Sequence, residues 1–194
     1  MNTLFSRYPA LASRLPYLPD AQLPTPLNKL DGLVMSARPA DIWVKRDDLT
    51  SPVYGGNKVR KLAFLLAAAK AANYKRVITF GGAGSNHALA TAMAAQALGL
   101  GCTNILGPQH NAYSVRRNLL ASLRAGARLV ACPWRETAAV TRREFWRATE
   151  EDGMFPALIP PGGSSPLGML GFVDAALEMA EQYASMGEKA PEVI

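Results

Sequence analysis

The chain has 194 residues, of which 49% are hydrophobic and 19% charged, which is enough apolar material for one domain or two small ones. No apolar run reaches the roughly 18 residues that span a bilayer, no signal peptide is visible, and the two cysteines make no disulfide framework, so we expect a cytoplasmic protein with no membrane partner. The net charge of +6 comes from scattered basic residues. Their densest group, at 135–147, is interleaved with glutamates, so we expect no nucleic-acid partner.

The first half of the chain opens with a proline-rich stretch. Residues 1–26 show no hydrophobic periodicity and are expected to form an irregular arm. A short strand is expected at 42–46. After Gly55 and Gly56, Asn57 is a reasonable N-cap for a helix with apolar residues at helical spacing.

From residue 77 onward, strand patterns alternate with helix patterns. Strands are expected at 77–80, 103–106, 128–131 and 157–159, and helices at 85–98, 115–123, 137–149 and 167–184. This alternation predicts right-handed β-α-β units, and therefore an α/β fold of open parallel twisted sheets with helices on both faces. The last residues, 192–194, look like the onset of another strand, which indicates a truncated C-terminus.

Three glycine-rich turns lie where strands are expected to end and helices to begin, at 55–58, 81–87 and 161–165. In open parallel sheets, ligands bind at the carboxyl ends of the strands. Small side chains and backbone N–H groups at a helix start also suit an anion. The three turns therefore predict a ligand site.

Several common sites do not match these turns. A dinucleotide fingerprint would need a glycine where the chain has His87, and no phosphate-binding P-loop motif occurs. A G-x-S-x-G nucleophile elbow fails in the same segment. The histidines at 87 and 110 and the cysteines at 102 and 132 lack metal-ligand spacing, so we expect no metal.

What remains is Lys58, at the first turn of its expected helix, where the helix dipole disfavours a cation. Position alone favours a surface lysine whose head reaches solvent. The other interpretation is an amine placed to attack a carbonyl group.

A family resemblance bears on this choice. The segment 55–62 reads Gly-Gly-Asn-Lys-Val-Arg-Lys-Leu and follows Lys-Arg-Asp-Asp at 45–48. It resembles the cofactor-lysine segment of the D-cysteine desulfhydrases and 1-aminocyclopropane-1-carboxylate (ACC) deaminases, which are pyridoxal 5′-phosphate (PLP) enzymes of the tryptophan synthase β-like class. Segments 84–87 and 161–168 resemble the second and third motifs of that family.

The resemblance runs from about Thr25 to the end of the chain and implies the tryptophan synthase β-like fold with its C-terminal part missing. Residues 1–50 and 157–194 would then belong to a partial large, PLP-binding domain. Residues 51–156 would form a small α/β domain. A homodimer is implied by the resemblance alone.

The same resemblance implies roles toward the PLP cofactor. Lys58 would bind PLP covalently and move the substrate Cα proton. Asn86 would hydrogen-bond the ring hydroxyl of the cofactor, and Lys61 could reach its phosphate. The pocket would be lined by Gly162, Gly163 and Ser164.

Further roles concern a small amino-acid substrate. Ser85 would be a candidate nucleophile or carboxylate ligand, and Asn86 would lie beside it. His87 would either contact the substrate or be satisfied by a local carbonyl group. The expected reaction is a desulfhydrase-like β-elimination giving an oxo acid, ammonia and sulfide, or a deaminase-like ring opening. The alternative is a non-catalytic, truncated family member with a binding or interaction role.

Overall fold

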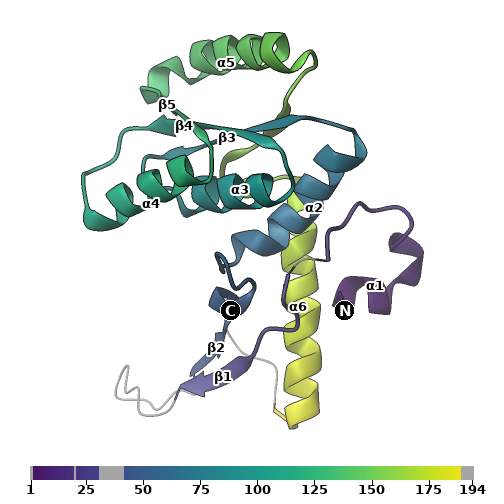
Figure 1. Ribbon diagram of the computed structural model, residues 1–194. Coiled ribbons are helices and arrows are strands. Elements are labelled where there is room, and N and C mark those ends of the chain that lie inside the picture. The colour runs from purple at the N-terminus through teal and green to yellow at the C-terminus, as the bar shows by residue number, and fades with distance from the viewer. Residues whose placement is uncertain (1, 20, 31–41, 189–194) are drawn as a thin grey trace.

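Figure 1 shows a computed structural model of the chain, which describes residues 2–19, 21–30 and 42–188. At its centre lies a four-stranded parallel sheet with the strand order β5-β4-β3-β6. The strands are β3 (Arg76–Gly82), β4 (Gly101–Gly107), β5 (Arg128–Ala131) and β6 (Ala157–Ile159). All four expected strands of the second half form, and the expected parallel sheet is confirmed.

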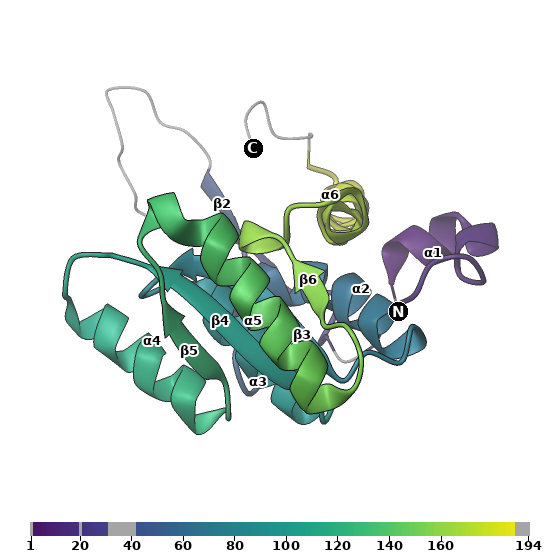
Figure 2. The ribbon, with the colours of Figure 1, turned by 90° about the horizontal axis from the view of Figure 1, so that it is seen from above.

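Helices cover both faces of this sheet, as Figures 1 and 2 show. On one face lie α2 (Lys58–Ala71), α3 (Asn86–Ala97) and α4 (Tyr113–Arg124), and on the other lies α5 (Thr137–Asp152). Val77 and Ile78 are both fully buried but belong to different core clusters, one beneath α2 and α3 and one beneath α5. Successive strand residues point to opposite faces, which explains why β3 is apolar throughout.

A second group of elements extends away from the sheet. The antiparallel pair of β1 (Leu27–Leu30) and β2 (Ile42–Lys45) lies near the lower part of the long helix α6 (Pro166–Met186), and α1 (Thr3–Arg7) packs beside α6 (Figure 1). Helix α2 packs against α6 as well. A Cβ atom on Gly171 would lie 2.4 Å from the carbonyl oxygen of Arg60, so glycine at this position allows the two helices to approach closely.

One part of the sequence prediction was wrong. The supposed irregular arm contains helix α1, whose N-cap Asn2 accepts a hydrogen bond from the backbone N–H of Phe5 at 3.1 Å. The backbone N–H of Leu4 donates to the Asp174 carboxylate at 2.8 Å, so this helix depends on a partner far along the chain. Strand β1, which was not among the expected strands, pairs with β2.

Local details also differ from expectation. Asn57 precedes α2, but its side chain makes no capping hydrogen bond. Four short 3₁₀ segments were not expected: Pro9–Leu11, Asp47–Leu49, Trp134–Glu136 and Pro161–Gly163. The expected strand onset at 192–194 lies outside the described residues. Among residues 2–19, 21–30 and 42–188, no helix is long and apolar enough to cross a membrane.

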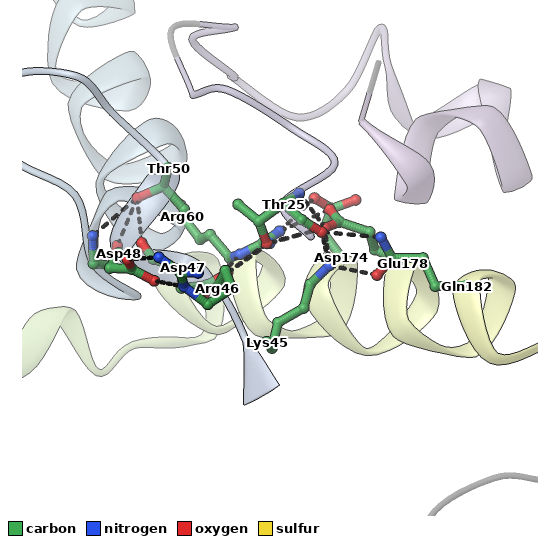
Figure 3. A network of polar contacts seen from close by, with 11 residues as sticks. Thr25, Lys45, Arg46, Asp47, Asp48, Thr50, Arg60, Asp174, Glu178 and Gln182 are labelled. Atoms are coloured by element: carbon green, nitrogen blue, oxygen red, sulfur yellow. Dashed lines mark hydrogen bonds and ion pairs between the residues drawn. The ribbon is translucent and has the colours of Figure 1, made fainter. Parts of the chain in front are cut away.

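A buried network of charged groups joins the arm, the β1-β2 pair, α2 and α6 (Figure 3). The guanidinium of Arg60, which is 2% exposed, donates to both carboxylate oxygens of Glu178 at 3.0 Å. It also donates to both carboxylate oxygens of Asp47 at 2.9 and 2.8 Å, and to the Thr25 hydroxyl at 3.0 Å. The Lys45 ammonium forms a further ion pair with Glu178.

The network keeps its members charged despite burial. Burial by itself would lower the pKa of Arg60, but hydrogen bonds and charges from Glu178 and Asp47 raise it above its ordinary value. Burial would likewise raise the pKa of Glu178, but Arg60 and Lys45 hold that pKa below its ordinary value. Buried Glu178 is thus compensated by Arg60 and Lys45 together, and Arg60 also pairs with the partly buried Asp47.

The variant Arg60→Met should therefore lose about 3 to 5 kcal/mol of unfolding free energy, because it removes the bidentate partner of the buried Glu178 carboxylate. The matched control is Arg46→Met, whose ion pair with Asp48 is exposed, and which should leave stability nearly unchanged. Urea denaturation followed by circular dichroism measures both. Equal losses in the two variants would contradict the role given to Arg60.

Candidate functional site

The strand order defines where a ligand would bind. The chain passes from β3 to β4 and β5 on one side, then returns to β6 on the other side of β3. The point at which the order reverses therefore lies between β3 and β6, and ligands of such sheets bind beyond the carboxyl ends of the strands at that point.

The glycine-rich turns lie around this point. The turn at 81–85 leads from β3 into α3, whose first residue is Asn86, and the turn at 161–165 leads from β6 into α6. The remaining turn, at 55–57, leads into α2, which begins at Lys58. Because β3 and β6 are hydrogen-bonded neighbours, the second and third motifs end side by side.

Gly163 is the residue at which the three motifs meet. Its φ of 66° lies in the left-handed region that glycine adopts without strain. A Cβ atom here would lie 3.3 Å from Cε1 of His87 and 3.5 Å from Cβ of Lys61. The third turn thus packs directly against both α2 and the start of α3.

Lys61 is buried, and its ammonium group binds the third glycine-rich turn, at 161–165. Its Nζ donates to the carbonyl oxygen of Gly162 and to the hydroxyl of Ser164, both at 3.2 Å. It also lies 4.6 Å from the centre of the Phe172 ring, and Nζ of Lys58 lies 6.0 Å from the same centre. Burial, and after it the charge of Lys58, lower the pKa of Lys61.

His87 is 3% exposed, and its ring lies against the same turn residue, Gly163, as Lys61. Its Nε2 is 3.0 Å from the hydroxyl oxygen of Thr79, and that hydroxyl donates to the carbonyl oxygen of Ile159 at 3.1 Å. Because the single hydroxyl hydrogen is used there, Nε2 must be the donor, and Nδ1 carries the lone pair. Nδ1 makes no hydrogen bond with any residue that the structure describes.

The surroundings keep the His87 ring neutral. Burial first, and then the charges of Lys58 and Lys61, lower the pKa of His87 to about 4, although the Pro160 carbonyl offsets part of this shift. At neutral pH the ring therefore presents an uncharged nitrogen, and it adds no third positive charge to the two lysines.

Ser85 and Asn86 form the start of α3. Ser85 is the N-cap, and its hydroxyl oxygen accepts from the backbone N–H of Ala88 at 3.2 Å. Asn86 is exposed, and its amide oxygen accepts from the Tyr54 hydroxyl at 3.2 Å and from Nδ2 of Asn118 at 2.8 Å. The cap bond leaves the Ser85 hydroxyl hydrogen without an acceptor among the residues that the structure describes.

The structure thus brings together most of the residues singled out by sequence. Lys58, Lys61, His87 and the turn at 162–164 form one cluster, with Ser85 and Asn86 at the adjoining helix start. Sequence reasoning missed the following partners: Tyr54, Thr79, Asn118 and Phe172. One signal was available for Asn118, because it is a polar residue on the buried face of α4 that also carries Val115 and Ser122.

Two cavities, of about 300 and 520 Å³, adjoin this region but are not lined by Lys58, Ser85, Asn86 or His87. The larger is lined by residues at the ends of β4 and β5, and the smaller by apolar residues of α2 and α3.

Comparison with known proteins places this arrangement in a family. A family model described as "Pyridoxal-phosphate dependent enzyme" matches residues 18–194. The chain is 42% identical over 171 residues to nocardicin C-9′ epimerase of Nocardia uniformis subsp. tsuyamanensis, covering 87% of this chain and 51% of that protein. It is 36% identical over 178 residues to D-cysteine desulfhydrase of Salmonella choleraesuis, covering 90% and 54%.

A solved structure agrees with these matches. The crystal structure of an ACC deaminase homologue has a TM-score of 0.75 at 33% identity, covering 94% of this chain and 54% of that one. The chain belongs to the family of pyridoxal-phosphate dependent enzymes, and the expected fold class and resemblance to desulfhydrases and ACC deaminases are confirmed. It spans about half the length of the curated relatives it matches.

The residues around the switch point fit the cofactor of this family. A group with an aldehyde and a phosphate needs an amine, cationic partners and space close to the backbone. Lys58 and Lys61 supply two ammonium groups at one ring, and Gly162 leaves open space beside the backbone of the third turn. The unpartnered Nδ1 of His87 is a buried polar atom of the kind that a ligand satisfies.

The depressed pKa of His87 predicts a pH dependence of stability. In the unfolded chain the ring has a pKa near 6.5, so protonation favours unfolding between that value and about 4. The contribution of neutral His87 is complete above pH 6.5 and is lost as the pH falls toward 4. Wild type should lose about 2 kcal/mol more than His87→Gln between pH 7 and pH 5, by urea denaturation.

The exposed His110 provides the control for this experiment. His110→Gln should keep the wild-type pH dependence of the unfolding free energy. If His87→Gln also keeps it, then His87 is not buried as the neutral ring described above.

Proposed function

We propose that the protein is a PLP-dependent lyase or deaminase that acts on a small amino acid, with Lys58 as the residue that binds the cofactor and moves the substrate Cα proton. The observation that carries this proposal is the position of Lys58. It begins α2 beside the sheet switch point, where all three glycine-rich turns of a PLP-family chain converge.

Bound PLP withdraws electrons from the substrate Cα and so makes the Cα–H bond acidic. The residues of this chain would bind the cofactor and orient the substrate for that chemistry. Lys61, with Gly162, Gly163 and Ser164, would supply positive charge and close backbone approach to the cofactor. The 4.6 Å contact between Lys61 and the Phe172 ring supports this, because it fixes the ammonium group beside the third turn.

The start of α3 would hold the substrate. The backbone N–H of Gly84 is already bound to the Gln109 side chain at 2.8 Å, so the N–H groups of Asn86 and His87 remain as partners for a carboxylate at the positive end of the helix. Ser85 lies beside them with an unused hydroxyl hydrogen. Neutral His87 can accept a hydrogen bond at Nδ1, and while it stays neutral it adds no charge to that of the lysines.

The course of the reaction after Cα deprotonation separates the candidate activities. A desulfhydrase-like β-elimination releases sulfide, ammonia and an oxo acid, and an ACC deaminase-like reaction opens a ring. Epimerisation at Cα is the second candidate, because the chain is 42% identical to a protein named as an epimerase. All three need the same proton transfer, which we assign to Lys58.

The proposal includes the domain division and the assembly. Residues 51–156 form the small α/β domain, and 1–50 with 157–194 contribute to a partial large domain; the separate group formed by the β1-β2 pair and α6 supports this (Figure 1). Strand β6 is an exception to this division, because it pairs with β3 and so lies in the sheet of the small domain. A cytoplasmic homodimer with PLP and a small amino acid as ligands completes the proposal.

Adding PLP to the purified chain should produce an absorption band in the near-ultraviolet or visible range, and borohydride reduction should leave the cofactor attached to the Lys58 peptide by mass spectrometry. Lys58→Ala should abolish both. The control Lys70→Ala changes an exposed lysine of the same helix and should leave both intact. Absence of the band and of the adduct in wild type would overturn the proposal for this chain.

The substrate assay then separates the three activities. D-cysteine, ACC and a single enantiomer of another small amino acid are offered to the loaded protein. Sulfide release, ammonia release from ACC, and loss of optical rotation without ammonia release mark the three reactions in turn.

A further inference from the structure

The Asn118 side chain connects the two residues on either side of Ser85. It is 2% exposed on α4, and its Nδ2 donates to the carbonyl oxygen of Gly84 at 2.9 Å and to Oδ1 of Asn86 at 2.8 Å. The Gln109 side chain holds the N–H of Gly84 from its other side. The peptide that leads into α3 is therefore held by Gln109, from the loop between β4 and α4, and by Asn118, from α4.

These contacts determine which way the Asn86 amide faces. A backbone carbonyl can only accept, so Asn118 must present its NH2 group to Gly84. The same NH2 group faces Asn86, so the atom of Asn86 that meets it must be the amide oxygen. The Asn86 NH2 group then points away from α4.

The Tyr54 hydroxyl supports the same orientation from the opposite side. It lies 3.2 Å from Oδ1 of Asn86, where it can act as the donor. Tyr54 is partly buried, and burial raises the pKa of its hydroxyl despite the nearby charge of Arg117, so the hydroxyl keeps its proton at neutral pH. Two donors thus converge on one oxygen of Asn86.

We propose that Asn118 is a positioning residue that, together with Tyr54, fixes the Asn86 amide so that its NH2 group is the only part left to bind a ligand. The chemistry presented is one hydrogen-bond donor, which suits an anionic oxygen. The proposal rests on the proposed function in one respect: the oxygen that Asn86 would meet is the ring oxygen of PLP. The orientation itself rests on contacts within this chain.

The substitution Asn118→Asp tests the orientation with almost no change in volume. The new carboxylate has no NH2 group to offer, and Arg117, whose Nε and Nη2 lie 3.5 Å from Oδ1 of Asn118, would keep it ionised. The carboxylate would repel both the Gly84 carbonyl and the Asn86 amide oxygen. Asn86 then rotates and donates its own NH2 group toward α4, which removes the donor from the ligand side.

Hydrogen exchange of side-chain amides, measured by NMR without any cofactor, gives the first readout. In wild type the buried NH2 of Asn118 should exchange slowly and that of Asn86 rapidly. In Asn118→Asp the exchange of the Asn86 NH2 group should slow by about tenfold, because it gains a charged acceptor. The exposed Asn111, which accepts from Arg116 near the start of the same helix, supplies the control Asn111→Asp with no expected change at Asn86.

PLP binding gives the second readout. Asn118→Asp should raise the PLP dissociation constant by about tenfold or more and shift the absorption band, because a hydrogen bond to a charged oxygen is lost. Tyr54→Phe should have a smaller effect, since Asn118 alone still holds the oxygen of Asn86. Asn111→Asp should bind PLP as wild type does.

The outcomes separate the two proposals. Failure of wild type to bind PLP overturns the proposed function, while the exchange pattern still decides the orientation of Asn86. Rapid exchange at Asn118 with slow exchange at Asn86 in wild type overturns the positioning role, and this measurement needs no variant to fold. Unchanged Asn86 exchange in a folded Asn118→Asp variant overturns it as well.

Discussion

The buried guanidinium of Arg60 is the interaction on which the arrangement of the site depends. It lies two residues from Lys58 on α2 and binds the carboxylates of Asp47 and Glu178 with almost no access to water. Such a group tolerates little displacement, because moving either carboxylate removes part of the compensation of a guanidinium that water barely reaches. The network therefore fixes the rotation of α2 relative to α6, and with it the side on which Lys58 and Lys61 emerge.

The cluster itself is built by convergence at the sheet switch point. Turns that follow β3 and β6 meet because those strands are neighbours, and Gly163 lets the third turn pack against His87 and Lys61. Burial keeps His87 neutral beside two lysines, and Asn118 and Tyr54 hold Asn86 in one orientation. The residues that would touch a cofactor are thus held by partners that would not touch it.

Sequence reasoning succeeded where the signal is local. The strands at 128–131 and 157–159 form as expected. Lys58, Ser85 and Asn86 were singled out by the family resemblance of the glycine-rich turns in or beside which they lie, and their roles stay a prediction. It failed where structure depends on distant partners: α1 is held by Asp174 and β1 by β2. The support of Asn86 by Asn118 joins residues 32 positions apart, and no short motif encodes such a pair.

The contacts of the N-terminal arm have a consequence for the order in which the protein assembles. Leu4 and Thr25 bind Asp174 and Glu178 over sequence separations of 170 and 153 residues. During synthesis the arm leaves the ribosome long before α6 exists, whereas the β-α-β units can form from neighbouring segments as they emerge. Until α6 has been synthesised, Arg60 on α2 cannot bind Glu178. The cluster around Lys58 therefore reaches its final geometry only after α6 packs against α2.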